Sequence, residues 1–202
     1  MQRLHRLSGA VAVATVIIIH PPSGKAATLD SVSIEKVFNN TFAHSHTTRL
    51  VGGALEPFYR AAGPFGATHL IFYRHDYAAS ALHEIAHWCV AGPARRRCDD
   101  YGYWYAPDGR DDVQQREFER VECTPQALEW VFSVAAGLPF RPSADNLAAQ
   151  LGPSEAFKRA VADRASTLIR EGLPSRAARF AGALDPLHHY LHSSHYELRA
   201  LA

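Results

Sequence analysis

One pentapeptide, His83-Glu84-Ile85-Ala86-His87, constrains this chain more than any other stretch. Its two histidines are four positions apart, so in a helix both imidazoles project from one face, about one turn apart. That spacing lets both rings bind one metal ion and puts Glu84 beside them, about 100° round the helix. The alternative is a helix with two partly buried, hydrogen-bonded histidines. We favour the metal site because the flanking residues suit a helix.

The flanking residues predict where this helix begins and ends. Ser80 is the expected N-cap, and Gly92-Pro93 is the expected stop. Two histidines leave a metal site incomplete, so a third protein ligand must come from elsewhere in the chain. The candidates are three carboxylates downstream, namely Glu119, Glu122 and Glu129. We favour Glu122, which lies at the junction of two predicted helices.

Composition limits the classes of protein to consider. The chain has 202 residues, of which 47% are hydrophobic, enough for one well-packed domain. A formal net charge of +1 gives no global attraction to nucleic acid or to an anionic membrane. The three cysteines are an odd number without a C-x-x-C pair, which argues against a disulfide scaffold and favours a reducing compartment.

The two ends of the chain differ from the rest. Arg3 and Arg6 precede the apolar run Gly9–Ile19, a pattern similar to a secretory signal and too short to span a membrane. The alternative is a disordered extension, or translated sequence upstream of the true start. We therefore expect a poorly ordered or signal-like segment at 1–30, one domain at 31–187, and a His-rich tail at 188–202.

Hydrophobic periodicity predicts a mainly helical α+β domain with a small sheet. His69–Tyr73 is β-compatible, and Thr47–Tyr59 is interpreted as loop and short strand, broken at Gly52-Gly53. Proline at position 125 should divide one helical region into two, because it lacks an N–H and clashes one turn back. The helices expected besides the histidine helix are Ser31–Phe42, capped by Ser31 or Ser33, Val113–Val121, Pro125–Ala136, Ser154–Arg170 and Ser175–Leu184.

Two loop segments have open interpretations. Arg95-Arg96-Arg97 is either a solvated basic turn or a contact for an acidic protein partner. The segment 99–112 sets four aromatic residues between two acidic pairs. Those aromatics are either core packing beneath a loop or the wall of a pocket for a cationic side chain.

Four blocks of sequence together resemble the elongation factor P hydroxylases of bacteria. They are A-L-H-E-I-A-H-W-C-V-A-G (81–92), Y-G-Y-W-Y-A-P-D-G-R (101–110), F-E-R-V-E-C-T-P-Q-A-L-E-W (118–130), and V-A-A-G-L-P-F with the following S-A-D-N-L (134–147). The resemblance implies a metalloprotease-like (zincin-like) fold that binds iron through two histidines and one carboxylate. By motif, His83 and His87 match the ligand histidines and Glu122 the carboxylate.

The resemblance also implies a reaction, the O2-dependent hydroxylation of a lysine on elongation factor P that already carries a β-lysyl group. We expect Fe(II), a cytoplasmic location, and no membrane or nucleic-acid partner. The lysine amine would be read by acidic residues among Asp99, Asp100, Asp108 and Asp111, with Tyr103 or Trp104 lining the slot. We expect the substrate-binding residues to include Tyr103, Trp104, Asp108 and Arg110.

Two other functions use the same pentapeptide. In a zinc peptidase, Glu84 would be the general base that activates a zinc-bound water. In the hydroxylase, Glu84 would act beside the ligands. A binding module with a structural metal is the third class, but structural zinc prefers four closed ligands that usually include cysteine. Cys89, two residues past His87, belongs to another helix face.

Overall fold

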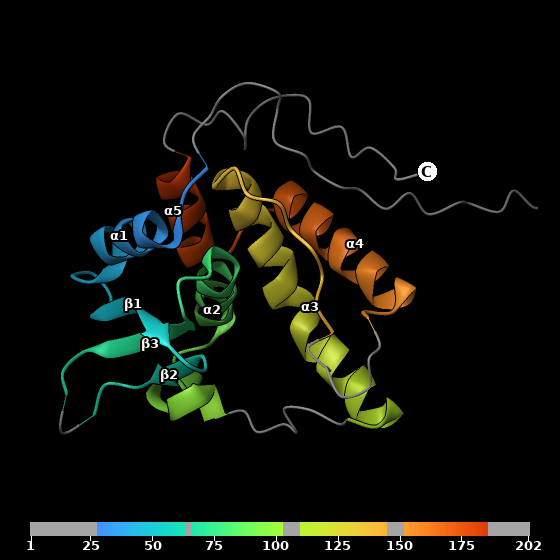
Figure 1. Ribbon diagram of the computed structural model, residues 1–202, viewed down its shortest axis with the longest axis horizontal. Helices are drawn as coiled ribbons and strands as arrows, with labels where there is room; N and C mark the ends of the chain where they lie inside the picture. The colour runs from blue at the N-terminus through green and yellow to red at the C-terminus, as the bar shows by residue number, and fades with distance from the viewer. Residues whose placement is uncertain (1–27, 64–65, 103–109, 145–151, 186–202) are drawn as a thin grey trace, which may run out of the picture.

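The computed structural model describes residues 28–63, 66–102, 110–144 and 152–185 (Figure 1). The predicted fold class is confirmed: within these ranges the chain is mainly helical and has one small sheet. None of the helices described is both long and apolar enough to cross a membrane. Most of the predicted N-terminal extension and all of the His-rich tail lie outside the described residues.

Three strands form the sheet in the order β1-β3-β2. Strand β1 (Thr48–Ala54) runs parallel to β3 (His69–Arg74), and β2 (Phe58–Arg60) pairs antiparallel with the other side of β3. Strand β1 does not end at Gly52-Gly53, so the predicted break is not a strand end, but the pairing of β1 with β3 shifts register between Val51 and Ala54. A side chain at Gly52 would lie 2.5 Å from the hydroxyl oxygen of Tyr73, so glycine here serves close packing.

Helix α1 (Ser31–Phe42) has its predicted bounds, and it packs against β1. The side chain of Asn39 accepts from the Leu50 N–H at 2.9 Å and donates to the Leu50 carbonyl at 3.0 Å. The predicted caps were wrong, because the side chain of Asp30 accepts the N–H of Ser33.

Helix α2 (Ala78–Val90) contacts β3 and the sheet on one side and the helices α1 and α3 on others (Figure 1). Trp88 anchors this helix in an aromatic cluster. Its ring centroid lies 5.2 Å from that of Phe38 and 4.8 Å from that of Phe42. Ser80 is not the predicted N-cap. Tyr77 occupies that position, and the Ser80 hydroxyl accepts the N–H of Arg74 instead.

Helix α3 (Asp112–Ala135) is continuous through Pro125, so the prediction of two separate helices is wrong. Pro125 cannot donate to the carbonyl of Val121, a loss that packing of α3 against α2 and α4 offsets. Two short 3-10 turns, η1 (Arg95–Arg97) and η2 (Asp99–Gly102), link α2 toward α3. Helices α4 (Glu155–Glu171), capped by Ser154, and α5 (Ser175–Leu184) complete the domain close to their predicted positions.

Candidate metal centre

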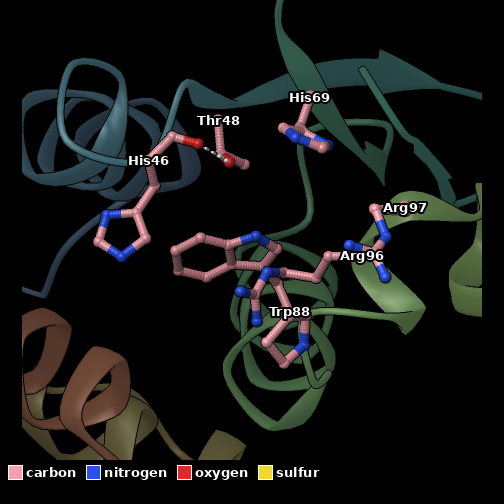
Figure 2. A pocket seen from close by; sticks show the side chains of 7 residues that line it. His46, Thr48, His69, Trp88, Arg96 and Arg97 are labelled. Atoms are coloured by element: carbon pink, nitrogen blue, oxygen red, sulfur yellow. Dashed lines mark hydrogen bonds between the residues drawn. The ribbon is translucent and has the colours of Figure 1, made fainter. Parts of the chain in front are cut away.

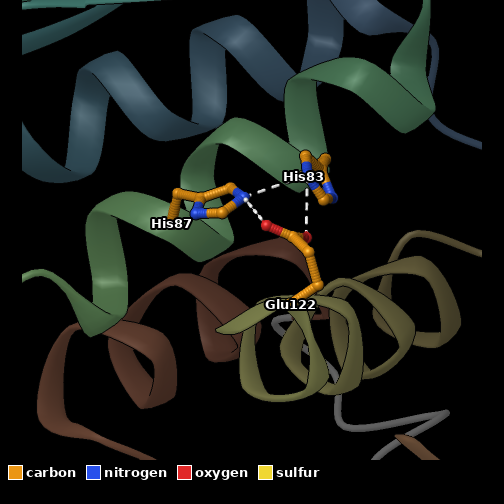
Figure 3. A group of neighbouring side chains, drawn as sticks. All are labelled: His83, His87 and Glu122. Carbon is orange, nitrogen blue, oxygen red and sulfur yellow. Dashed lines mark hydrogen bonds and ion pairs between the residues drawn. The ribbon is translucent and has the colours of Figure 1, made fainter. Parts of the chain in front are cut away.

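Helices α2 and α3 bring two imidazoles and one carboxylate to a common point (Figure 3). The Nε2 atoms of His83 and His87 are 3.0 Å apart. Glu122 Oε1 lies 3.2 Å from His87 Nε2, and Glu122 Oε2 lies 3.5 Å from His83 Nε2. The structure therefore assembles the three residues that the sequence singled out, with the histidine pair on α2 and the acid on α3.

This donor set fits a metal ion. Glu122 is only 2% exposed, and its Oε2 atom has no hydrogen-bond partner in the described part of the chain. A buried carboxylate oxygen without a donor is costly, and a cation would satisfy it. Two imidazoles and one carboxylate suit ferrous iron or zinc and leave coordination positions open. Among the described residues the group contains no cysteine, unlike a closed structural zinc site.

Glu129, one of the three candidate carboxylates, contacts the far side of the His83 ring. Its Oε2 atom accepts from His83 Nδ1 at 2.8 Å. A hydrogen on Nδ1 leaves the lone pair of Nε2 directed at the common point, which is how carboxylates commonly orient a metal-binding histidine. Glu119 lies elsewhere, near Gln115 and Ser154. The sequence favoured Glu122 as the ligand but assigned no separate role to Glu129.

The electrostatics of the site favour positive charge. Burial alone would lower the pKa of His83, but its hydrogen bond to Glu129 and the charges of Glu129 and Glu122 raise it to about 10. Burial would raise the pKa of Glu122, but His87 and His83 lower it to about 2. The metal-free site thus holds a proton among the same groups that would ligate an ion, so metal and proton compete there.

A pocket of about 650 Å³ opens beside these residues. Its lining is rich in carboxylates: besides Glu122 and Glu129, it includes Glu56, Glu84 and Asp100. Burial raises the pKa of Glu84. A stacked pair of tyrosines forms part of the wall, with the rings of Tyr59 and Tyr101 4.2 Å apart. The Tyr101 hydroxyl is buried without a hydrogen-bond partner in the described chain.

Of the four predicted substrate-binding residues, the structure describes only Arg110. Tyr103, Trp104 and Asp108 lie outside the described residues. Arg110 is 6% exposed, donates to the Ala144 carbonyl at 2.8 Å, and stacks over the Phe118 ring at 3.9 Å. Arg110 is not among the described residues that line the pocket. Its contacts with Ala144 and Phe118 instead join the residue just before α3 to the segment that follows α3.

The acidic residues of the same loop mainly bind backbone. Asp99 accepts the N–H of Ala61 and Asp100 accepts the N–H of Tyr59, which ties η2 to β2. Asp111 is the N-cap of α3 and forms a capping box with Gln114. Of these three acids, Asp100 alone lines the pocket.

Sequence reasoning noted the spacing of Glu122 and Gln126 but did not join them with Glu129 into one polar face of α3. Gln126 holds Ser143 through both ends of its amide, at 2.9 and 3.0 Å. Glu122, Gln126 and Glu129 follow one another at spacings of four and three, so in one continuous helix they share a face. That spacing was a usable signal, but the assumed break at Pro125 concealed it.

Comparison with known proteins adds an independent finding. A family model described as elongation factor P hydroxylase matches residues 37–198 of this chain. The chain is also similar to the elongation factor P lysine hydroxylase of Haemophilus influenzae. The two are 46% identical over 148 residues, which cover 73% of this chain and 83% of the relative.

Proposed function

Because this chain belongs to the elongation factor P hydroxylase family, we propose that it hydroxylates a lysine side chain of elongation factor P, using Fe(II) and O2. The observation that carries the proposal is the convergence of His83, His87 and Glu122 beside an acidic pocket. We further propose that the lysine already carries a β-lysyl group and that the reaction takes place in the cytoplasm.

The residues have distinct roles in this proposal. His83, His87 and Glu122 hold the ion, and Glu129 fixes the ring of His83 through Nδ1. Ferrous iron in a two-histidine, one-carboxylate site supplies O2 activation at its open coordination positions. The protein's own task is to bring one carbon of the lysine side chain to that point and to hold it there.

The pocket chemistry suits a long cationic side chain. A β-lysyl-lysine carries positively charged amines on aliphatic stems, so it needs carboxylates for its charges and an apolar wall for its methylenes. Glu56 and Asp100 supply negative charge, and the stacked rings of Tyr59 and Tyr101 supply the wall. Glu84 lines the same pocket beside the ligands, where its carboxyl group can accept a hydrogen bond from a substrate amine.

Mass spectrometry tests the reaction directly. Protein reconstituted anaerobically with Fe(II) is mixed with β-lysylated elongation factor P and with excess ascorbate, a reductant that supplies the two electrons needed to convert the second oxygen atom of O2 to water. The mixture is then exposed to ordinary or isotopically heavy O2. We expect the modified lysine to gain one oxygen atom, and that atom to be the heavy isotope when heavy O2 is used. The matched control is elongation factor P without the β-lysyl group, which should react more slowly.

Two results would contradict the proposal. One is a product oxygen that comes from water rather than from O2. The other is cleavage of a peptide bond by the zinc-loaded protein, with Glu84→Gln abolishing that cleavage while the metal is retained, as expected of a hydrolase.

A further inference from the structure

A second pocket, of about 210 Å³, lies near the C-terminal end of α2, between β1, β3 and η1 (Figure 2). None of its described lining residues also lines the pocket beside the candidate metal ligands. Its described lining residues include no carboxylate; they are His46, Thr48, His69, Trp88, Pro93, Arg96 and Arg97. Its character is therefore basic, in contrast to the acidic pocket of the metal centre.

In the part of the chain that the structure describes, the positive charges of Arg96 and Arg97 have no ion-pair partner. Within the described ranges no carboxylate lies within ion-pair distance of Arg96 or Arg97. Arg96 donates to the Ala91 carbonyl, and Arg176 donates to the same carbonyl oxygen at 2.6 Å. Burial and the neighbouring charge of Arg96 lower the pKa of Arg176. An anion in the pocket would offset this repulsion.

Trp88 offers the pocket a buried donor that nothing else uses. Its side chain is fully buried, and its Nε1 atom has no hydrogen-bond partner in the described chain. Figure 2 shows the indole nitrogen on the ring edge directed toward Thr48 and His69. Because an indole N–H can only donate, a buried one needs an acceptor, and the pocket is where that acceptor would sit.

His69 is set to donate as well. The backbone N–H of Ala62 donates to His69 Nδ1 at 3.0 Å, so in the neutral ring Nε2 carries the hydrogen. The Thr48 hydroxyl donates its hydrogen to the His46 carbonyl. The pocket thus combines two guanidinium groups with an indole and an imidazole N–H, a surplus of donors over acceptors.

We propose that this pocket binds one small oxyanion, a phosphate or a carboxylate group, held by Arg96, Arg97 and the Trp88 N–H. The donor set is that of oxyanion sites in general, in which guanidinium groups give charge-assisted hydrogen bonds. The small volume limits the ligand to a group of this size.

Tyr59 connects this site to the metal pocket. Its hydroxyl lies 2.9 Å from the Arg96 carbonyl and 2.8 Å from His69 Nδ1, while its ring lines the larger pocket. An anion that holds Arg96 and His69 in position therefore also holds the Tyr59 ring in position, and that ring is part of the wall where the substrate side chain would lie.

Titration calorimetry on the full-length protein tests the proposal, with sodium phosphate and sodium succinate as separate titrants at constant ionic strength. We expect saturable one-site binding. Arg97→Gln should weaken it by about 10-fold, the value of one charge-assisted hydrogen bond. Trp88→Phe keeps a ring but removes the N–H, and should weaken it by about 5-fold. The exposed Arg97 can be changed without touching the core, so that variant stays informative if Trp88→Phe fails to fold.

Arg49→Gln is the matched control. It removes the same charge from an exposed position on β1, next to Thr48 but on the opposite face of the strand. Tighter binding of phosphate than succinate assigns the site to phosphate, and the reverse assigns it to a carboxylate. The proposal is overturned by absence of saturable binding, by an equal loss in Arg49→Gln, or by binding that disappears when a chelator removes the metal.

Discussion

Two neighbouring residues at the edge of the metal pocket have left-handed backbone conformations. Asp100 has a φ of 47° and Tyr101 a φ of 56°, although neither is glycine. Such a conformation costs roughly 1–2 kcal/mol for each residue. The surrounding contacts hold it in place: Asp100 accepts the Tyr59 N–H at 2.9 Å, and the Tyr101 ring stacks on the Tyr59 ring. The strained turn thereby presents an aromatic wall to the pocket.

Removal of the Glu122 carboxylate should empty the metal centre. In Glu122→Gln the ion loses its only negatively charged ligand. Loss of a residue that merely hydrogen-bonds a ligand lowers metal affinity by up to about 100-fold, so we expect loss of the ligand itself to lower it by more than that. Metal content after dialysis against a weak chelator measures this. Glu119→Gln, one turn earlier on α3, is the control and should keep its metal. Equal metal retention in both variants would exclude Glu122 as a ligand.

Glu129 should act through His83 and not on the ion itself. Glu129→Ala removes the acceptor of the Nδ1 hydrogen, so we expect metal affinity to fall by about 10–100-fold. Glu129→Gln keeps an acceptor oxygen, and its loss should be clearly smaller. If the two variants lose the metal equally and completely, Glu129 is a ligand in its own right.

Some residues of the site could be predicted from local helical geometry, whereas others depend on which helices pack together. His83 and His87 required only helical geometry, since both belong to one helix. Glu122 required knowledge of which carboxylate on a distant helix faces them; its place at the predicted helix junction favoured it, and the family resemblance pointed to the same residue. The role of Glu129 depends on the packing of α3 against α2, which no local pattern encodes.

At the scale of elements, Asp111 at the start of α3 has two possible roles, substrate binding and helix capping. Asp111 was a candidate reader of the substrate amine, and in the structure it caps α3. Asp111→Ala should therefore cost about 1 kcal/mol of folding free energy and lower Tm by about 2–4 °C.

Asp111→Asn gives the control, since asparagine caps as well as aspartate does and lacks the charge. Thermal unfolding and turnover of the modified substrate are measured for both variants. A stable Asp111→Asn protein with strongly reduced turnover would restore the substrate role.

The free edge of β1 gives a second prediction. Strand β1 is the outer strand on its side of the sheet, and Asn39 supplies the hydrogen bonds that a neighbouring strand would make to Leu50. Asn39→Ala leaves that N–H and carbonyl without partners, so we expect a loss of about 2 kcal/mol in denaturant unfolding. The adjacent Asn40 is exposed, and Asn40→Ala should change little. Because alanine has a higher helix propensity than asparagine, propensity alone would stabilise both variants, so an unchanged stability of Asn39→Ala would contradict the role of this contact.

The helices were more predictable than their ends and interruptions. Apolar residues at helical spacing predicted α1, α4 and α5 because those faces pack on one core. Pro125 misled because the rule for proline describes an isolated helix, whereas α3 is supported by α2 and α4 over its length. Ser80 misled because its hydroxyl is engaged by the N–H of Arg74 in the preceding strand.

For the whole molecule, metal binding and folding should be linked. The candidate ligands come together only when α2 and α3 are docked, so the folded chain binds the ion and the unfolded chain does not. A metal concentration of 100 times Kd should add about 2.7 kcal/mol of stability, or roughly 5–10 °C in Tm for a domain of this size. Scanning fluorimetry under anaerobic conditions, with Fe(II) or with a chelator, measures it. The shift should vanish in Glu122→Gln, and its persistence there would place the binding elsewhere.

The arrangement of the sheet was beyond local sequence reasoning. Strand β3 pairs in parallel with β1, while β2, which lies between them in the sequence, takes the other side of β3. Residue periodicity marks which segments are extended but not which edges meet, because pairing depends on contacts distant in sequence.

The division of the metal centre between α2 and α3 has a consequence for how the protein matures. Synthesis proceeds from the amino end, so the two histidines leave the ribosome while the acid that completes their set is still to be made. A nascent chain can offer an ion only two neutral nitrogens, which is a weak and unselective grip. Loading of the complete site therefore has to wait until α3 has been made and has packed against α2.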